Sequence, residues 1–514
     1  MKQAFLSYLF ISTALITLSS GHFRVNTETT NDQSNPALAI DSSGNFIIAW
    51  SSYAQDGDSG GIFAQRFGAN YSPLGEEFQV NIITGGNQTA PDIAADLHGN
   101  FVVVWHGPGP NQEDIFARRF DCYGQALGSE FRVNDDPNGR DIHPKISMSK
   151  TGNFVIVWEN NQIVADYEIW QILYKIYDPN AVPIATGKVN LLFQCRYPDV
   201  SIDGNNNFTV VWVQDDIYHT SNVIMARQYY GNGTVKNSPW QVNTTSVDSL
   251  TQSSIAMDGS GHFIVTWDGH PDSSNEDNIY ARRYKFDATA LTGELLVNTT
   301  TDGAQQHPKA AMNSKREFVI VWNSENPSGS NIRDIHGQRY NSSSAPIGYE
   351  FRINTYIAMD QKYPAVVLNE NSEFLTAWQS YGQDGSGYGI FADTGPKTGS
   401  ADINDDGFVN SFDYLFLADQ WFEQLNPLTA NLINDNKIDQ FDLAVFCQQW
   451  LTESYQKTKV DINADSRIDL RDYNLFSDNW LKQGPNLAGD ITGNGIVDMT
   501  DLQALVFHWG KSWE

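Results

Sequence analysis

The chain has 514 residues, of which 40% are apolar, 12% aromatic and 18% charged. This length exceeds the roughly 100 to 200 residues of a typical domain, and the composition excludes a largely disordered polyelectrolyte, so we expect more than one folded unit. The formal net charge of −29 repels polyanions and excludes nucleic acid as an expected partner. The three cysteines cannot all pair within one chain, which excludes a disulfide framework.

Residues 1–21 have the pattern of a secretory signal peptide. One lysine precedes an apolar run from Ala4 to Leu18, and small residues follow up to Gly21. An uncleaved membrane anchor is the alternative, but no charged stop-transfer segment follows. Since no later stretch approaches 18 consecutive apolar residues, we expect no membrane span once the signal is removed. The sequence therefore predicts a secreted protein, extracellular or associated with the cell surface.

A repeat of 53 to 56 residues follows, marked by seven tryptophans. These are Trp50, Trp105, Trp158, Trp212, Trp267, Trp322 and Trp378. Each ends a strand-like run such as GNFIIAW or REFVIVW, with one alternating segment before it and two after it, such as GIFAQRF and EFQVN. Four strands per repeat are typical of a propeller blade, so we predict an all-β, seven-bladed β-propeller over residues 22–395.

The two ends of the repeat region complement each other. The seventh unit stops near Gly395 without a fourth strand, while the segment Phe23-Arg24-Val25-Asn26 resembles an isolated fourth strand. We therefore predict that the N-terminal strand completes the seventh blade and closes the propeller. The units resemble GNFVVAW…GIFAQR…EFQVN repeats of large secreted bacterial proteins. That resemblance implies a fold, because propellers serve as hydrolases, lyases and binding platforms alike.

Candidate ligand-binding residues stand at the start of the first strand of each repeat, where propeller ligands usually sit over the central channel. The positions are Asn35, Ala90, His143, Tyr197, Gln252, His307 and Tyr363. Aromatic and imidazole rings can stack on a sugar and hydrogen-bond its hydroxyl groups, which makes His143, Tyr197, His307 and Tyr363 the candidates for carbohydrate binding. Alternatively, most of these residues precede proline and serve only to start an extended strand.

Acidic residues recur in the loops after the tryptophans and raise the question of glycoside hydrolysis, which needs a carboxyl pair. They are Asp56, Asp58, Glu113, Asp114, Asp215, Asp216, Asp272, Glu276, Asp277 and Asp384. Their recurrence in several repeats favours solvated turns, and no single repeat carries an elaborated catalytic loop. We therefore name no catalytic residue. His98, His106 and His219 lack a companion at metal-ligand spacing, and whether Cys122 and Cys195 pair stays open.

After the short linker at 396–400, residues 401–514 contain four segments of a second repeat, with periods of 29 or 30 residues. Each is a 12-residue loop rich in Asp and Asn, the oxygen ligands that Ca²⁺ prefers, and each leads into an apolar helical pattern. The predicted Ca²⁺ ligands are Asp402, Asn404, Asp406, Asn410 and Asp413; Asn431, Asp435, Asp439 and Asp442; Asp461, Asn463, Asp465, Asp469 and Asp472; and Asp490, Thr492, Asn494, Asp498 and Asp501. We expect the second loop to bind weakly or not at all, since Ile433 and Asn436 occupy a ligand position and the tight turn.

These loop-helix units resemble type I dockerin repeats, here as two tandem pairs in an EF-hand-like α-helical domain. The resemblance implies docking to a cohesin-like protein module through loop positions 10 and 11. In this chain those positions are Ser411, Phe412, Gln440, Phe441, Leu470, Arg471, Met499 and Thr500. They depart from the Ser-Thr pair of the family, so another partner, or docking onto the propeller itself, stays open.

Together these features predict a secreted calcium-binding protein with a recognition platform and a docking tail. The propeller would bind a carbohydrate or protein ligand, and the dockerin-like tail would attach it to a cohesin-like partner. The alternative is an extracellular polysaccharide-degrading hydrolase or lyase with a dockerin tail, because familiar dockerins most often accompany glycan-degrading enzymes.

Overall fold

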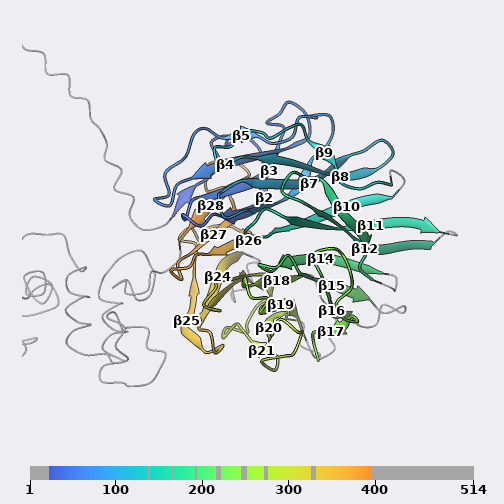
Figure 1. Ribbon diagram of the computed structural model, residues 1–514. Helices are drawn as coiled ribbons and strands as arrows, with labels where there is room; N and C mark the ends of the chain where they lie inside the picture. Colours follow the sequence, from blue (N-terminus) through green and yellow to red (C-terminus); the bar gives the residue numbers. More distant parts are fainter. Residues whose placement is uncertain are drawn as a thin grey trace, which may run out of the picture.

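The computed structural model describes residues 22–394, apart from 137–138, 165–166, 191–193, 216–221, 245–251, 271–275 and 326–331. Within this part of the chain the strands form seven four-stranded antiparallel sheets. Figure 1 shows these sheets arranged around a common centre. The predicted all-β, seven-bladed propeller is therefore confirmed. The predicted signal peptide, the linker and the dockerin-like tail lie outside the described residues.

Blades 1 to 6 each consist of four strands in chain order, the first nearest the central axis. Blade 1 contains β2 (Gln33–Ile40), β3 (Phe46–Tyr53), β4 (Gly60–Phe67) and β5 (Phe78–Gln79). Blade 2 contains β6 (Thr89–Ala95), β7 (Phe101–Pro108), β8 (Glu113–Phe120) and β9 (Phe131–Arg132). Blade 3 contains β10 (Arg140–Met148), β11 (Phe154–Val164), β12 (Tyr167–Tyr177) and β13 (Pro183–Lys188). Blade 4 contains β14 (Cys195–Ile202), β15 (Phe208–Asp215), β16 (Asn222–Tyr229) and β17 (Trp240–Gln241).

Blades 5 and 6 follow the same order, and blade 7 takes its outermost strand from the N-terminus. Blade 5 contains β18 (Ser253–Met257), β19 (Phe263–Gly269), β20 (Asn278–Tyr284) and β21 (Leu295–Leu296). Blade 6 contains β22 (Gln305–Met312), β23 (Phe318–Glu325), β24 (Arg333–Tyr340) and β25 (Pro346–Arg352). Blade 7 contains β26 (Gln361–Leu368), β27 (Phe374–Tyr381), β28 (Tyr388–Asp393) and the N-terminal strand β1 (Phe23–Arg24).

Two observations establish that the ring is closed. The strand β1 pairs antiparallel with β28, with Phe23 opposite Ala392, which confirms the predicted closing strand. The first strand of each blade contacts the first strand of the next, and β26 contacts β2. The seven first strands therefore surround a central channel.

Within residues 22–394, the described core residues form seven clusters, one between each pair of neighbouring blades. The repeat tryptophans lie on the second strands and are at most 2% exposed. Alternation along these strands explains the arrangement, because Phe101, Val103 and Trp105 pack toward blade 1 while Val102 and Val104 pack toward blade 3. The strands read as continuous apolar runs because both faces are buried between blades.

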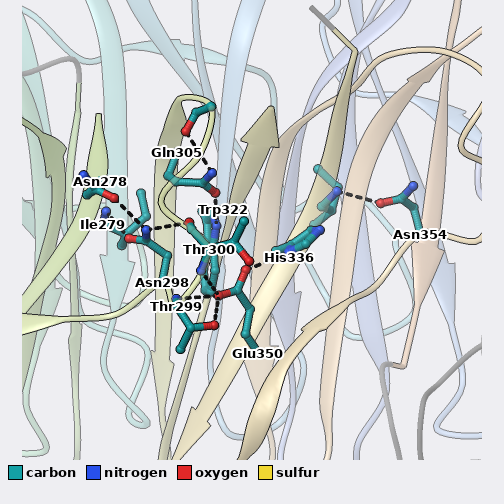
Figure 2. Close-up of polar contacts among 12 residues, drawn as sticks. Asn278, Ile279, Asn298, Thr299, Thr300, Gln305, Trp322, His336, Glu350 and Asn354 are labelled. Atoms are coloured by element: carbon teal, nitrogen blue, oxygen red, sulfur yellow. Dashed lines mark hydrogen bonds and ion pairs between the residues drawn. The ribbon is translucent and has the colours of Figure 1, made fainter. Parts of the chain in front are cut away.

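A buried asparagine after each fourth strand fixes that strand to its blade. These residues are Asn26, Asn81, Asn134, Asn190, Asn243, Asn298 and Asn354. In all seven, the side-chain Oδ1 accepts a hydrogen bond of 2.6–3.0 Å from the backbone N–H of an isoleucine on the third strand. Figure 2 shows this contact between Asn298 and Ile279. Asn26 makes it to Ile390, so the closing strand is held in blade 7 as the other fourth strands are held in theirs.

Candidate functional site

The candidate ligand-binding positions lie where the first strands begin, at one mouth of the channel. Six of the seven precede proline and adopt the left-handed conformation, with φ of 50–57°. The pairing of first and second strands shifts at each of these six positions, which identifies a β-bulge. These six residues therefore form a β-bulge instead of an extended start of the strand, and ligand binding by them stays a prediction. Gln252 precedes serine and has no positive φ.

The backbone N–H at the bulge is donated to a neighbouring blade. Its acceptor is the side chain of the residue that follows the repeat tryptophan in the preceding blade. The observed pairs are Asn35 with Gln379, His143 with His106, Tyr197 with Glu159, His307 with Asp268 and Tyr363 with Asn323, at 2.9–3.4 Å. Sequence reasoning missed these acceptors, although a polar residue directly after a buried tryptophan was a visible signal.

Blade 5 is the exception that supports this relation between blades. The residue after Trp212 is Val213, which cannot accept a hydrogen bond, and the next blade begins with Gln252 rather than with a residue before proline. The N–H of Gln252 is instead donated to Asp268 of its own blade, at 3.0 Å. The bulge therefore occurs where the preceding blade supplies a polar partner.

His143 and Tyr197 are brought together by Glu159, whose side chain is buried. Glu159 Oε1 accepts the N–H of Tyr197 at 2.9 Å and lies 3.2 Å from His143 Nδ1. The imidazole ring of His143 also meets that of His106 edge-on, with centroids 5.6 Å apart. Burial lowers the pKa of His106 to about 3, so at neutral pH its Nδ1 is free to accept the N–H of His143. This cluster belongs to blades 2, 3 and 4.

His307 and Tyr363 form a second pair, on blades 6 and 7. Their rings meet edge-on with centroids 4.8 Å apart. Asn323 supports both residues, because its Nδ2 lies 3.1 Å from His307 Nδ1 and its Oδ1 accepts the N–H of Tyr363 at 3.1 Å. Burial lowers the pKa of His307, so the ring is held neutral at pH 7.

The four predicted ligand residues thus form two separate pairs: His143 and Tyr197 share Glu159 as a partner, and His307 and Tyr363 are in ring contact. Tyr197 is 36% exposed, Tyr363 is 40% exposed and the side chain of His143 is 47% exposed. Their backbones are held by hydrogen bonds to the preceding blades, while the ring faces are accessible. Such a site can stack on an apolar sugar face and donate or accept hydrogen bonds at its edges.

The acidic loop residues differ from the expected solvated turns at two positions. Asp114 and Asp277 are 0% and 7% exposed. Asp114 Oδ1 accepts a hydrogen bond from Asn134 at 2.8 Å, and Asp277 lies 2.9 Å from His270 Nδ1. The prediction of a solvated turn is wrong for these two, because their carboxylates complete hydrogen-bond networks inside or between blades. Asp216 and Asp272 lie outside the described residues.

The structure bears on the predictions about metal ligands and cysteines only where the residues are described. In the described part of the chain, no group of three or more His, Cys, Asp or Glu side chains is arranged to hold a metal ion. Cys122 and Cys195 are not joined by a disulfide, and Cys195 begins β14 in the buried core. The predicted calcium ligands from Asp402 to Asp501 and the partner-contact positions from Ser411 to Thr500 lie outside the described residues, as does His219. In the same described segments, no helix is long and apolar enough to cross a membrane.

Comparisons with known proteins return similar folds only. No protein-family model and no curated protein sequence matches the chain. A protein of unknown function from Dyadobacter fermentans aligns at 11% identity with a TM-score of 0.44, covering 73% of this chain and 97% of that one. The β-propeller domain of the Trilobed protease from Pyrococcus furiosus aligns at 10% identity with a TM-score of 0.41, covering 71% and 95%. The GH93 α-L-arabinofuranosidase of Fusarium graminearum aligns at 11% identity with a TM-score of 0.36, covering 50% and 82%.

Proposed function

We propose that the propeller is a carbohydrate-recognition platform that binds its ligand at the channel mouth. The observation that carries this proposal is the two ring clusters, which are His143 with Tyr197, joined through Glu159, and His307 with Tyr363, in edge-on contact. Each combines an accessible aromatic face with hydrogen-bonding edges, which is the chemistry that a sugar ring requires. A protein ligand at the same mouth is the other recognition partner that the sequence leaves open.

The rigidity of the four positions supports binding. Bulge hydrogen bonds hold the backbone of each residue to the preceding blade, as from Tyr197 to Glu159 at 2.9 Å. Side chains that are already positioned lose little conformational entropy when a ligand arrives, so more of the contact energy appears as affinity. The two ring clusters lie on blades 3 and 4 and on blades 6 and 7, so an extended ligand could contact both across the mouth.

The alternative is a polysaccharide-degrading hydrolase or lyase that uses carboxylates at the mouth. The candidates would be Glu159 and Asp268, which occupy the same position in blades 3 and 5. Glu159 accepts the N–H of Tyr197, and Asp268 accepts the N–H groups of Gln252 and His307. Acceptors that are engaged by backbone donors suit a positioning role better than proton transfer, so we favour recognition.

Binding of neutral oligosaccharides to the full chain, measured by titration calorimetry, tests this proposal. Tyr197→Ala and Tyr363→Ala are each expected to weaken binding about five- to tenfold, since a stacked aromatic contributes about 1 kcal/mol. The control is Tyr123→Ala, because Tyr123 is 74% exposed and lies in the turn between β8 and β9. Equal affinity in all variants, or no binding by the wild type across a broad panel, would refute the proposal. Release of new reducing ends would favour the enzyme.

We further propose that residues 401–514 bind Ca²⁺ and dock the secreted protein to a cohesin-like partner. The support is loop chemistry, since three of the four loops carry oxygen ligands at every expected side-chain position. Metal analysis of the full chain is expected to find about three Ca²⁺ per molecule, and about two after Asp461→Ala. Chelation is expected to lower the unfolding temperature, because clustered carboxylates repel one another without the cation. Purified protein without calcium would contradict this.

A further inference from the structure

The wall of the channel breaks the sevenfold symmetry just inside the mouth. The residue two positions after each mouth position lines a cavity of about 340 Å³. In blade order these residues are Ala37, Asp92, Lys145, Asp199, Ser254, Lys309 and Ala365. Blades 2, 3, 4 and 6 therefore present charges, while blades 1, 5 and 7 present small uncharged groups.

The two lysines belong to a tripeptide that occurs in only two of the repeats. His143-Pro144-Lys145 begins blade 3, and His307-Pro308-Lys309 begins blade 6. In both, the bulge at the histidine places its ring at the mouth and the lysine two residues further along, at the channel wall. Blades 3 and 6 are three steps apart in a ring of seven, so the two lysines approach from opposite sides.

The two channel aspartates already have backbone partners. Asp92 Oδ2 accepts the N–H of Ile146 at 2.9 Å. Asp199 accepts the N–H groups of Val200 and Ile255, at 2.9 and 3.1 Å. Both carboxylates therefore satisfy backbone donors on the first strands of the channel wall.

The lysines are less fully paired. Lys145 Nζ lies 3.8 Å from Asp92 Oδ1, at the limit of an ion pair. Among the described residues no hydrogen bond or ion pair engages the ammonium group of Lys309. Burial, and then the charge of Lys145, lower the pKa of Lys309, while Asp199, Asp92 and Asp268 oppose that shift. Two ammonium groups that repel each other across a confined cavity are stabilised when an anion lies between them.

We propose that the channel cavity binds a small sugar acid, with its carboxylate between Lys145 and Lys309. A multiply charged anion such as phosphate would be repelled by Asp92 and Asp199, whereas the hydroxyl groups of a sugar acid can donate hydrogen bonds to these carboxylates. The cavity also presents Ser147, Ser201 and Ser254. Its volume of about 340 Å³ lies at the low end of the range of about 300–1,000 Å³ for ligand pockets, which suits a monosaccharide. The choice of a sugar rests on the proposed carbohydrate recognition, and the choice of an anion does not.

Calorimetric titration of the full chain with D-galacturonate at pH 7 tests the inference. Lys309→Met and Lys145→Met are each expected to weaken binding at least tenfold, with Lys309→Arg retaining most of it. Lys236→Met is the matched control, since its Nζ bonds the carbonyl of Phe286 far from the channel. Lys309→Met is expected to unfold at the wild-type temperature or above, because its ammonium group has no ion-pair partner among the described residues, so a loss of binding in this variant would not reflect misfolding.

Three results would overturn the inference: no galacturonate binding by the wild type, unchanged binding by Lys309→Met, or equally tight binding of acetate or inorganic phosphate. The same measurements distinguish a failure of the proposed function at the mouth from a failure of the inference about the channel. If neutral oligosaccharides do not bind but galacturonate binding depends on Lys309, the mouth proposal is wrong and the channel inference stands. If neutral binding depends on Tyr363 and galacturonate does not bind, the reverse holds.

Discussion

Replacing Asn134 by aspartate is expected to lower the free energy of unfolding at pH 8 by about 3–5 kcal/mol. Asn134 Nδ2 donates hydrogen bonds to Asp114 Oδ1 and Asp141 Oδ2, both at 2.8 Å, and to the carbonyl of Asp136 at 3.0 Å. The side chains of Asn134, Asp114 and Asp141 are buried. Asn134→Asp removes the donor that separates two carboxylates and adds a third negative charge beside them. Urea unfolding followed by tryptophan fluorescence measures the loss.

The matched control is Asn298→Asp, at the same repeat position in another blade. Asn298 Nδ2 donates to the side-chain oxygen of Asn278 at 2.7 Å and to the carbonyl of Thr300 at 2.9 Å (Figure 2). The amide of Asn278 can rotate and donate to the new carboxylate, so we expect a loss of only about 1 kcal/mol. Equal losses in the two variants would contradict the role of the neighbouring carboxylates.

The loss of unfolding free energy caused by Asn134→Asp should also depend on pH. Burial is the main cause that raises the pKa of Asp141 to about 7. A new carboxylate at position 134, in contact with Asp141, raises the pKa of Asp141 further. A native state with raised carboxyl pKa values binds more protons than the unfolded chain, so its stability is present at low pH and is lost as the pH rises through those values. The difference between variant and wild type is therefore expected to be smallest near pH 4 and full near pH 8. A constant difference would count against this explanation.

Val25→Asp is expected to cost about 3–4 kcal/mol and to loosen the joint between blades 7 and 1. Val25 is 3% exposed and packs in the cluster that contains Trp50, Ala377 and Ile390. Its N–H is donated to the carbonyl of Ile390 at 2.8 Å. A carboxylate in this cluster has no partner, so the closing strand would detach and expose the edge of β28.

Hydrogen exchange by mass spectrometry can locate this effect. Faster exchange is expected in β1 and β28, with blades 3 and 4 on the opposite side largely unchanged. Arg24→Ser is the control, because Arg24 lies on the same strand with its side chain exposed. Uniform acceleration over all blades, or the same result for Arg24→Ser, would show that closure does not depend on the buried face of this strand.

The architecture was predictable because its signals are local. A tryptophan at a regular interval, alternating apolar residues and four strand-like segments recur in each unit, and strands that are adjacent in sequence pair with each other. The closing strand was predictable from the missing fourth strand after Gly395 and the matching segment at Phe23. These predictions needed no knowledge of how neighbouring blades face each other.

The features that the sequence did not reveal all depend on contacts between blades. The buried Glu159 follows Trp158 in its own strand, yet it supports Tyr197 of the next blade. Lys145 and Lys309 are separated by more than 160 residues and share one cavity only because the ring is closed. One signal for the bulge was present in the sequence. In six blades the tryptophan is followed by a polar residue and the next blade has a residue before proline at its mouth position, whereas Val213 in blade 4 is apolar and Gln252 in blade 5 precedes serine. Only a comparison between successive repeats reveals this relation.

The pairing of β1 with β28 also has a consequence for folding kinetics. Six blades can form from strands that are close in sequence, whereas the seventh needs Phe23 to meet Ala392 across nearly the whole propeller. Loop-closure entropy makes such a distant contact slow relative to local hairpins. Until it forms, β28 presents an unpaired edge that can pair with another chain. The closing step is therefore where folding and self-association compete, and dilution during refolding should favour the monomeric ring.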